Sequence, residues 1–243
     1  MIPLLIFFIE LAVLYVLATR LTQAVYDLTI LLFRSRPIGI MVVSLLTFPG
    51  TVVHELSHLF TAEVLGVHTG KLTLVPENIQ DEEVKAGSVM IAQSDPFRRY
   101  MIGLAPIFSG LICITALSYL LVNPSVIPVS WGEFSIFNIQ FSVLSIIFFY
   151  LLFAVSNAMF SSSEDLKGFI PFAIALGAMI AAAYVAGLRI GLTGFLLDTV
   201  TTILFSLTKS LGIVLAVNIF GLLVTKGLII IAEKFIHRRI IRR

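Results

Sequence analysis

The chain has 243 residues, of which 58% are hydrophobic and only 12% are charged. Soluble domains carry about 25% charged residues, so this composition indicates an integral membrane protein. A formal net charge of +2 is too small to indicate a nucleic-acid-binding protein, and the single Cys113 excludes an intrachain disulfide. We therefore expect a multi-pass protein of the cell membrane whose constant partner is the lipid bilayer.

Six stretches approach the roughly 20 apolar residues that a spanning helix needs. In chain order they are residues 2–18, 38–67, 100–122, 136–160, 169–188 and 211–232. The predicted fold class is an all-α polytopic membrane protein, with residues 1–243 forming one integral membrane domain. The apolar segment 191–207 is short and contains glycine, so it is either an interfacial or re-entrant piece or an early start of the last helix.

Basic residues near the segment ends predict the orientation. The tail carries Lys234 and four arginines after residue 237, which places the C-terminus in the cytoplasm. Each span takes the chain to the other side of the membrane, so counting the predicted spans back from the C-terminus places the polar stretch 68–99 in the cytoplasm as well. Arg20 and the arginines at 34 and 36 would then lie outside, so either the first helix inserts unusually or residues 21–33 form an interfacial helix.

The polar stretch itself predicts a small cytoplasmic-side β-hairpin. Residues 71–75 and 88–93 are short β-prone runs, and the acidic region 77–83 separates them. Two such runs around a turn region are typical of a hairpin.

The pentad His54-Glu55-Leu56-Ser57-His58 lies in the second predicted span. Positions i and i+4 of a helix lie on one face about a turn apart, so the two imidazoles can hold one zinc ion while Glu55 stands beside it as a base. Ionisable groups at membrane depth are costly and mark functional sites.

Two histidines do not complete a catalytic zinc site, which usually has three protein ligands and a fourth position for water. His68 and His237 lie at or beyond membrane ends, which leaves carboxylates near helix termini as candidates. Asp165 closes a run that begins at Asn157 and interrupts an apolar helix with polar residues. Non-helical backbone at membrane depth is tolerated only where it is buried in protein or lines a wet cavity, so we expect a site there.

These motifs make the chain resemble the site-2 protease family of intramembrane zinc metalloproteases. Members of that family pair a His-Glu-x-x-His helix with a later helix that bears Asn-x-x-Pro-x-x-x-Leu-Asp-Gly. Asn157 and Asp165 keep the family's eight-residue separation, and residues 94–106 are similar to the segment that opens the intervening helix. The resemblance covers roughly residues 48–168.

The resemblance implies one Zn²⁺ per chain, held by His54, His58 and Asp165. It implies that Glu55 and Asn157 are catalytic, with Asn157 holding the substrate backbone or the developing oxyanion. It also implies a three-helix catalytic core at about 38–168, flanked by helices in 1–37 and 169–243.

The chain departs from the family pattern in three places. Ser57 replaces a glycine, Phe160 stands where the family has proline, and Leu166-Lys167 follow the aspartate where glycine is expected. Serine also permits close helix approach, so the first change is small. The other two leave Glu164 open as an alternative third ligand.

The implied substrate is a transmembrane protein or peptide, which must unwind locally before water can attack its backbone. The hairpin is a candidate edge for capturing the unwound segment by strand addition. Three alternatives stay open. They are a metalloprotease whose third ligand is Glu77, Glu82 or Glu83, a metal or ion transporter, and a catalytically silent membrane scaffold.

Overall fold

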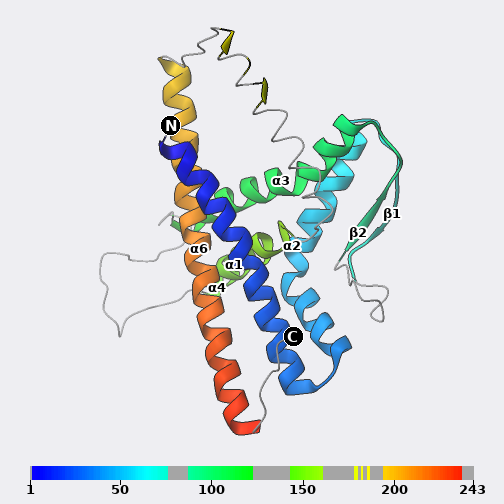
Figure 1. Ribbon diagram of the computed structural model, residues 1–243, viewed down its shortest axis with the longest axis vertical. Helices are drawn as coiled ribbons and strands as arrows, with labels where there is room; N and C mark the ends of the chain where they lie inside the picture. Colours follow the sequence, from blue (N-terminus) through cyan, green and yellow to red (C-terminus); the bar gives the residue numbers. More distant parts are fainter. Residues whose placement is uncertain are drawn as a thin grey trace.

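The computed structural model is mostly helical. It describes residues 2–75, 87–122, 143–160 and 194–236, together with positions 178, 179, 182, 185 and 186. The helices are α1 (Ile2–Phe33), α2 (Arg36–Val64), α3 (Pro96–Val122), α4 (Val143–Ala158) and α6 (Phe195–Ile236). The strands β1 (Thr69–Thr73) and β2 (Ser88–Ile91) pair as an antiparallel hairpin beside α2, outside the helix bundle (Figure 1). A helical bundle with one small hairpin is therefore confirmed for the described residues.

Four of these helices are long and apolar enough to cross a bilayer. The candidate spans are Leu4–Phe33, Arg36–Val64, Pro96–Leu121 and Asp198–Ile236. The predicted span 136–160 is described from Val143 to 160, where α4 has 16 residues. The predicted span 169–188 lies almost entirely outside the described residues. The described part of the chain thus supports four of the six predicted spans.

Helix α1 is one continuous helix of 32 residues, and residues 21–33 do not form a separate interfacial helix. No proline or glycine occurs between Leu4 and Phe33, so nothing in the sequence interrupts the helix. At 1.5 Å per residue it is about 48 Å long, against about 30 Å for the apolar core of a bilayer. The chain then reverses at Arg34, whose φ of 56° ends the helix, and Pro37 lies in the first turn of α2.

Helix α6 has 42 residues and runs beside α1 along most of the length of α1 (Figure 1). Its length of about 63 Å is twice the apolar thickness of a bilayer. The helix begins at Phe195. From Phe195 onward, the apolar segment 191–207 is therefore the early start of the last helix.

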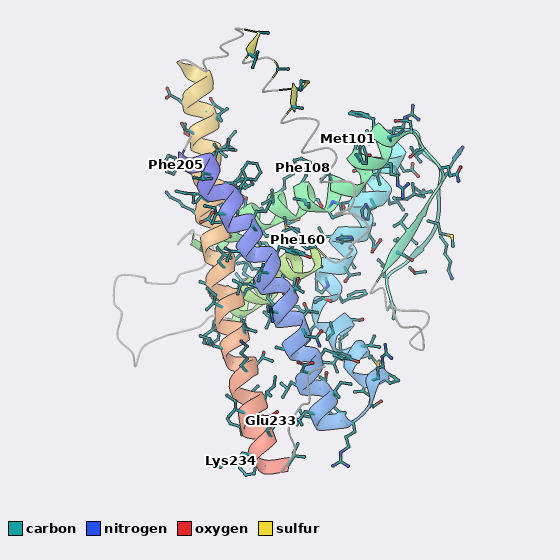
Figure 2. All side chains as sticks on the ribbon, viewed as in Figure 1. Met101, Phe108, Phe160, Phe205, Glu233 and Lys234 are labelled. Atoms are coloured by element: carbon teal, nitrogen blue, oxygen red, sulfur yellow. The ribbon has the colours of Figure 1, made fainter. Side chains whose placement is uncertain are left out.

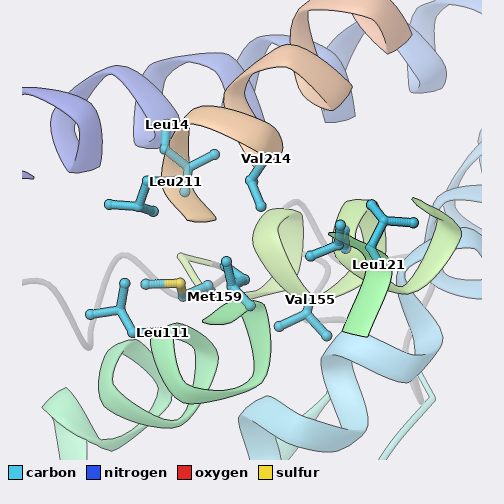
Figure 3. Close-up of a cluster of buried hydrophobic side chains, with 9 residues drawn as sticks. Leu14, Leu111, Leu121, Val155, Met159, Leu211 and Val214 are labelled. Carbon is cyan, nitrogen blue, oxygen red and sulfur yellow. The ribbon is translucent and has the colours of Figure 1, made fainter. Parts of the chain in front are cut away.

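The main core lies where α1, α3, α4 and α6 meet. Its buried apolar side chains close the space between the helices (Figure 3), and they are Leu14, Leu111, Ile114, Leu121, Leu152, Val155, Met159, Leu211 and Val214. The outer surface is also apolar: Phe108 and Phe205, labelled in Figure 2, are 58% and 54% exposed. Soluble monomers rarely expose large contiguous apolar patches, so these exposed side chains fit a lipid-facing surface.

The hairpin follows α2 after a tight turn. Gly66 has a φ of 66°, and the amide of Val67 donates to the carbonyl of Ala62 at 2.8 Å, which closes the helix end. Leu72 then pairs with Val89 across the two strands. The hairpin predicted from residues 71–75 and 88–93 is confirmed, and it directly follows the helix that carries the two histidines.

Candidate metal centre

The His-Glu-x-x-His pentad lies in the second half of α2, the helix that packs against both α3 and α4. His54, Glu55 and His58 are 3%, 5% and 6% exposed. His58 is six residues before Val64, the last residue of α2, so the pentad ends about 9 Å inside the helix end. Three ionisable side chains are therefore buried inside a candidate membrane span, which is a setting where such groups are kept for function.

Helices α2 and α4 touch through Gly50. A Cβ at this position would lie 2.6 Å from the carbonyl carbon of Ala154 and 2.7 Å from the Cβ of Ala158. Small residues permit such close approach between membrane helices. Gly50 lies one turn before His54 on the same helix face, and Asn157 belongs to the turn of α4 that contains these alanines. The contact therefore sets the Asn157 helix against the helix that carries the imidazoles.

The two imidazoles converge through one nitrogen each. The Nε2 atoms of His54 and His58 are 3.2 Å apart, and the rings meet edge to face with centroids 4.9 Å apart. Two nitrogens bound to one zinc at 2.0–2.1 Å with tetrahedral angles are about 3.3 Å apart. The pair is therefore spaced as two ligands of one zinc ion, although this separation also suits a single N–H···N hydrogen bond.

A contact from α3 determines which nitrogen of His58 carries the proton. Nδ1 of His58 lies 2.9 Å from the carbonyl oxygen of Ile102, and a carbonyl oxygen can only accept a hydrogen bond. In the neutral imidazole, Nδ1–H therefore donates and Nε2 keeps its lone pair. Metal-binding histidines use the same arrangement, in which a carbonyl holds the ring and directs the other nitrogen at the metal.

The hairpin approaches Glu55 closely. A Cβ added at Gly87, just before β2, would lie 2.9 Å from Cγ and Oε1 of Glu55 and from Cγ2 of Thr51. All three are side-chain atoms, so a larger residue at position 87 would have to displace Glu55 or Thr51. The hairpin therefore covers the carboxylate that the motif assigns as the general base, on the side away from the bundle.

Asn157 is buried at the end of α4 and belongs to a polar cluster with α6. Its Nδ2 donates to Oδ1 of Asn218 at 2.8 Å and to the carbonyl of Phe153 at 2.7 Å. Asn218 in turn donates to Oγ of Ser156 at 3.0 Å and to the carbonyl of Val214 at 3.0 Å. Within the described chain, the Oδ1 of Asn157 is buried and has no hydrogen-bond partner.

Asn218 is a buried polar residue that the sequence-based predictions do not include, because they assign the last helix only as a membrane span. It is fully buried in α6, between the exposed residues Lys209 and Lys226. An asparagine near the middle of an apolar run is itself a signal, because such residues in membrane helices usually bond to another helix.

The predicted third ligand cannot be placed, because Asp165 and Glu164 lie outside the described residues, as do Glu77, Glu82 and Glu83. Among the residues that are described, no group of three or more His, Cys, Asp and Glu side chains is arranged to hold a metal. His68 lies between α2 and β1 and is exposed, whereas both imidazoles of the pentad are buried. The structure thus brings together two of the three predicted ligands and leaves the third a prediction.

Comparison of the chain with protein-family models, with curated proteins and with solved structures finds no match.

Proposed function

We propose that the chain is an intramembrane zinc metalloprotease of site-2 protease type. The observation that carries this proposal is the pair of Nε2 atoms, 3.2 Å apart inside a candidate span, with the second imidazole oriented by a carbonyl of α3. His54 and His58 would hold the ion, with Asp165 or Glu164 as the third ligand. When bound, zinc would polarise the scissile carbonyl and make a water molecule more acidic.

Two side chains of the protein, those of Glu55 and Asn157, have separate roles in the proposed reaction. Glu55 accepts a proton from the attacking water and returns it to the leaving amine, the part that the middle carboxylate of this motif takes. Burial between helices excludes bulk water, which strengthens each electrostatic contact in the site. Asn157 contacts the substrate backbone from the side of α4.

The substrate would be a membrane-spanning or membrane-adjacent segment, because the pentad lies inside a candidate span and not in a soluble domain. A helical substrate hides its peptide carbonyls in its own hydrogen bonds, so a few residues must unwind before attack. The hairpin beside Glu55 supports strand addition as the means of holding the unwound segment, since in the described part of the chain its two strands pair only with each other and have outer edges with N–H and C=O groups.

The test is cleavage of a single-pass peptide in detergent by purified protein. Glu55→Gln should keep its zinc and lose about 10²–10⁴-fold in rate, the usual contribution of a general base. Glu63→Gln is the matched control, because Glu63 is an exposed carboxylate two turns further along α2. Cleavage by Glu55→Gln at the wild-type rate would contradict the proposal, and zinc binding without any cleavage by the wild type would favour a transporter or a scaffold.

The hairpin has a separate test in Val89→Pro. Proline removes a backbone donor from β2 and cannot continue a strand ladder. Zinc content should stay at the wild-type level while cleavage falls about tenfold, because Val89 lies in β2, paired with Leu72, and both imidazoles are carried by α2. Unchanged cleavage would contradict the strand-addition hypothesis without contradicting the proposed metal site.

A further inference from the structure

The amide pair between α4 and α6 assigns a role to a residue outside the sequence motifs. We infer that Asn218 is a positioning residue, a role that rests on the proposed function. By accepting one N–H of Asn157, it holds that amide with its Oδ1 available to accept a backbone N–H of the unwound substrate.

The orientation of both amides follows from the helix carbonyls below them. Nδ2 of Asn157 lies 2.7 Å from the carbonyl oxygen of Phe153, and Nδ2 of Asn218 lies 3.0 Å from that of Val214. Carbonyl oxygens only accept, so each amide must turn its nitrogen toward its own helix. With Nδ2 of Asn157 so placed, its second N–H meets Oδ1 of Asn218 at 2.8 Å.

This arrangement uses both amide N–H groups of Asn157 and leaves only an acceptor. Its Oδ1 is buried without a hydrogen-bond partner among the described residues, and the whole residue is 8% exposed. A buried acceptor without a hydrogen bond is unfavourable, so a ligand that donates to it is bound more tightly. A backbone N–H of the substrate is such a donor, whereas a developing oxyanion is not.

The geometry therefore separates the two roles that the family resemblance gave to Asn157. Stabilising an oxyanion needs a donor aimed at the developing charge, and both donors of Asn157 are already engaged. Holding the substrate backbone needs an acceptor, which is the group that remains. Substrate binding is the role that fits.

The competing explanation is a purely structural bond that joins α4 to α6. Hydrogen-bonded polar pairs do join membrane helices, and each contributes modestly to the stability of the bundle. A structural bond would act on the whole bundle, and its loss would lower stability and zinc content together. A positioning bond would act through Asn157 alone, so its loss should have no effect once Asn157 has been removed.

A double-mutant cycle distinguishes the two. Asn218→Leu keeps a similar volume without the acceptor, Asn157→Ala removes the substrate contact, and the third variant combines them. Each single variant should raise KM for a single-pass peptide roughly tenfold with kcat within about twofold, because the contact is made in ground and transition states alike. The double variant should match Asn157→Ala alone. Zinc should remain at one per chain throughout.

Ser156→Ala is the matched control, because it removes the hydroxyl that accepts from Asn218 at 3.0 Å and from Nδ2 of Asn157 at 3.5 Å, and leaves the 2.8 Å bond between the two asparagines in place. Its KM should stay within about twofold of wild type. If Asn218→Leu fails to fold, Asn218→Ala replaces it in the same cycle.

Three results would overturn the inference. The first is an unchanged KM in the Asn218 variant. The second is a KM in the double variant that rises by the product of the two single increases. The third is a fall in zinc content large enough to account for the lost cleavage. The proposed function is tested separately, because wild-type protein that binds zinc but never cleaves would overturn the protease proposal and the role of Asn218 with it.

Discussion

Replacing Gly50 with alanine should force α2 and α4 apart at the level of the site. The new Cβ would lie 2.6 Å from the carbonyl carbon of Ala154 and 2.7 Å from the Cβ of Ala158. Carbon atoms in contact keep about 3.5–4.0 Å, so the helices must separate by about 1 Å. Backbone atoms supply the closest contacts, and no side-chain rotation can relieve them.

Two effects should follow from that displacement. Overpacking of this kind destabilises proteins by about 1–3 kcal/mol, which corresponds to a fall of roughly 2–12 °C in melting temperature for a chain of this size. A displacement of 1 Å in a catalytic arrangement can lower the rate about 10²-fold. His54 and His58 are both carried by α2 and keep their spacing, so any loss of zinc in this variant would come from the proposed third ligand, which follows α4 in the sequence.

The assay compares peptide cleavage, zinc content and melting temperature in detergent for Gly50→Ala and Gly212→Ala. Gly212 is an exposed glycine of α6 with nothing within 4 Å of an added Cβ, so the same substitution there should be harmless or slightly stabilising. Wild-type stability and cleavage in Gly50→Ala would refute the close packing of α2 on α4. Lost stability with unchanged cleavage would refute a role for α4 in the chemistry.

Two further outcomes are expected from the contacts around the site. Gly87→Ala should lower kcat about 10–100-fold at unchanged zinc content. The new methyl group would lie 2.9 Å from Oε1 of Glu55 and would displace the carboxylate. A kcat equal to that of the wild type would mean that the hairpin does not constrain Glu55. Treatment with a chelator should abolish cleavage and added Zn²⁺ should restore it, and cleavage that persists in metal-free protein would contradict zinc catalysis.

The elements that the sequence predicts well are those with a local signal. An apolar run is long enough by itself to indicate α2 and α3, and the i, i+4 spacing puts the two imidazoles on one face whatever surrounds them. The hairpin was recognisable because short β-prone runs flank an acidic turn region. Each of these depends on residues within about 30 positions of one another.

The contacts between distant segments were not predictable in the same way. Gly50 in α2 and Gly87 before β2 look like ordinary glycines until the atoms that face them are known. Asn218 lies 61 residues from Asn157, and no helix periodicity connects the two. The position of Arg20 left two interpretations open, an unusual insertion of the first helix or a separate interfacial helix over residues 21–33, and the continuous helix α1 contradicts only the second.

Metal analysis of purified protein tests the central claim most directly. The wild type should carry one zinc per chain, His58→Ala and Asp165→Ala should each lose it, and His68→Ala should keep it because that imidazole is exposed before β1. Protein that carries no zinc after purification and cannot be loaded with added Zn²⁺, or a His58→Ala variant that holds zinc as the wild type does, would contradict the account.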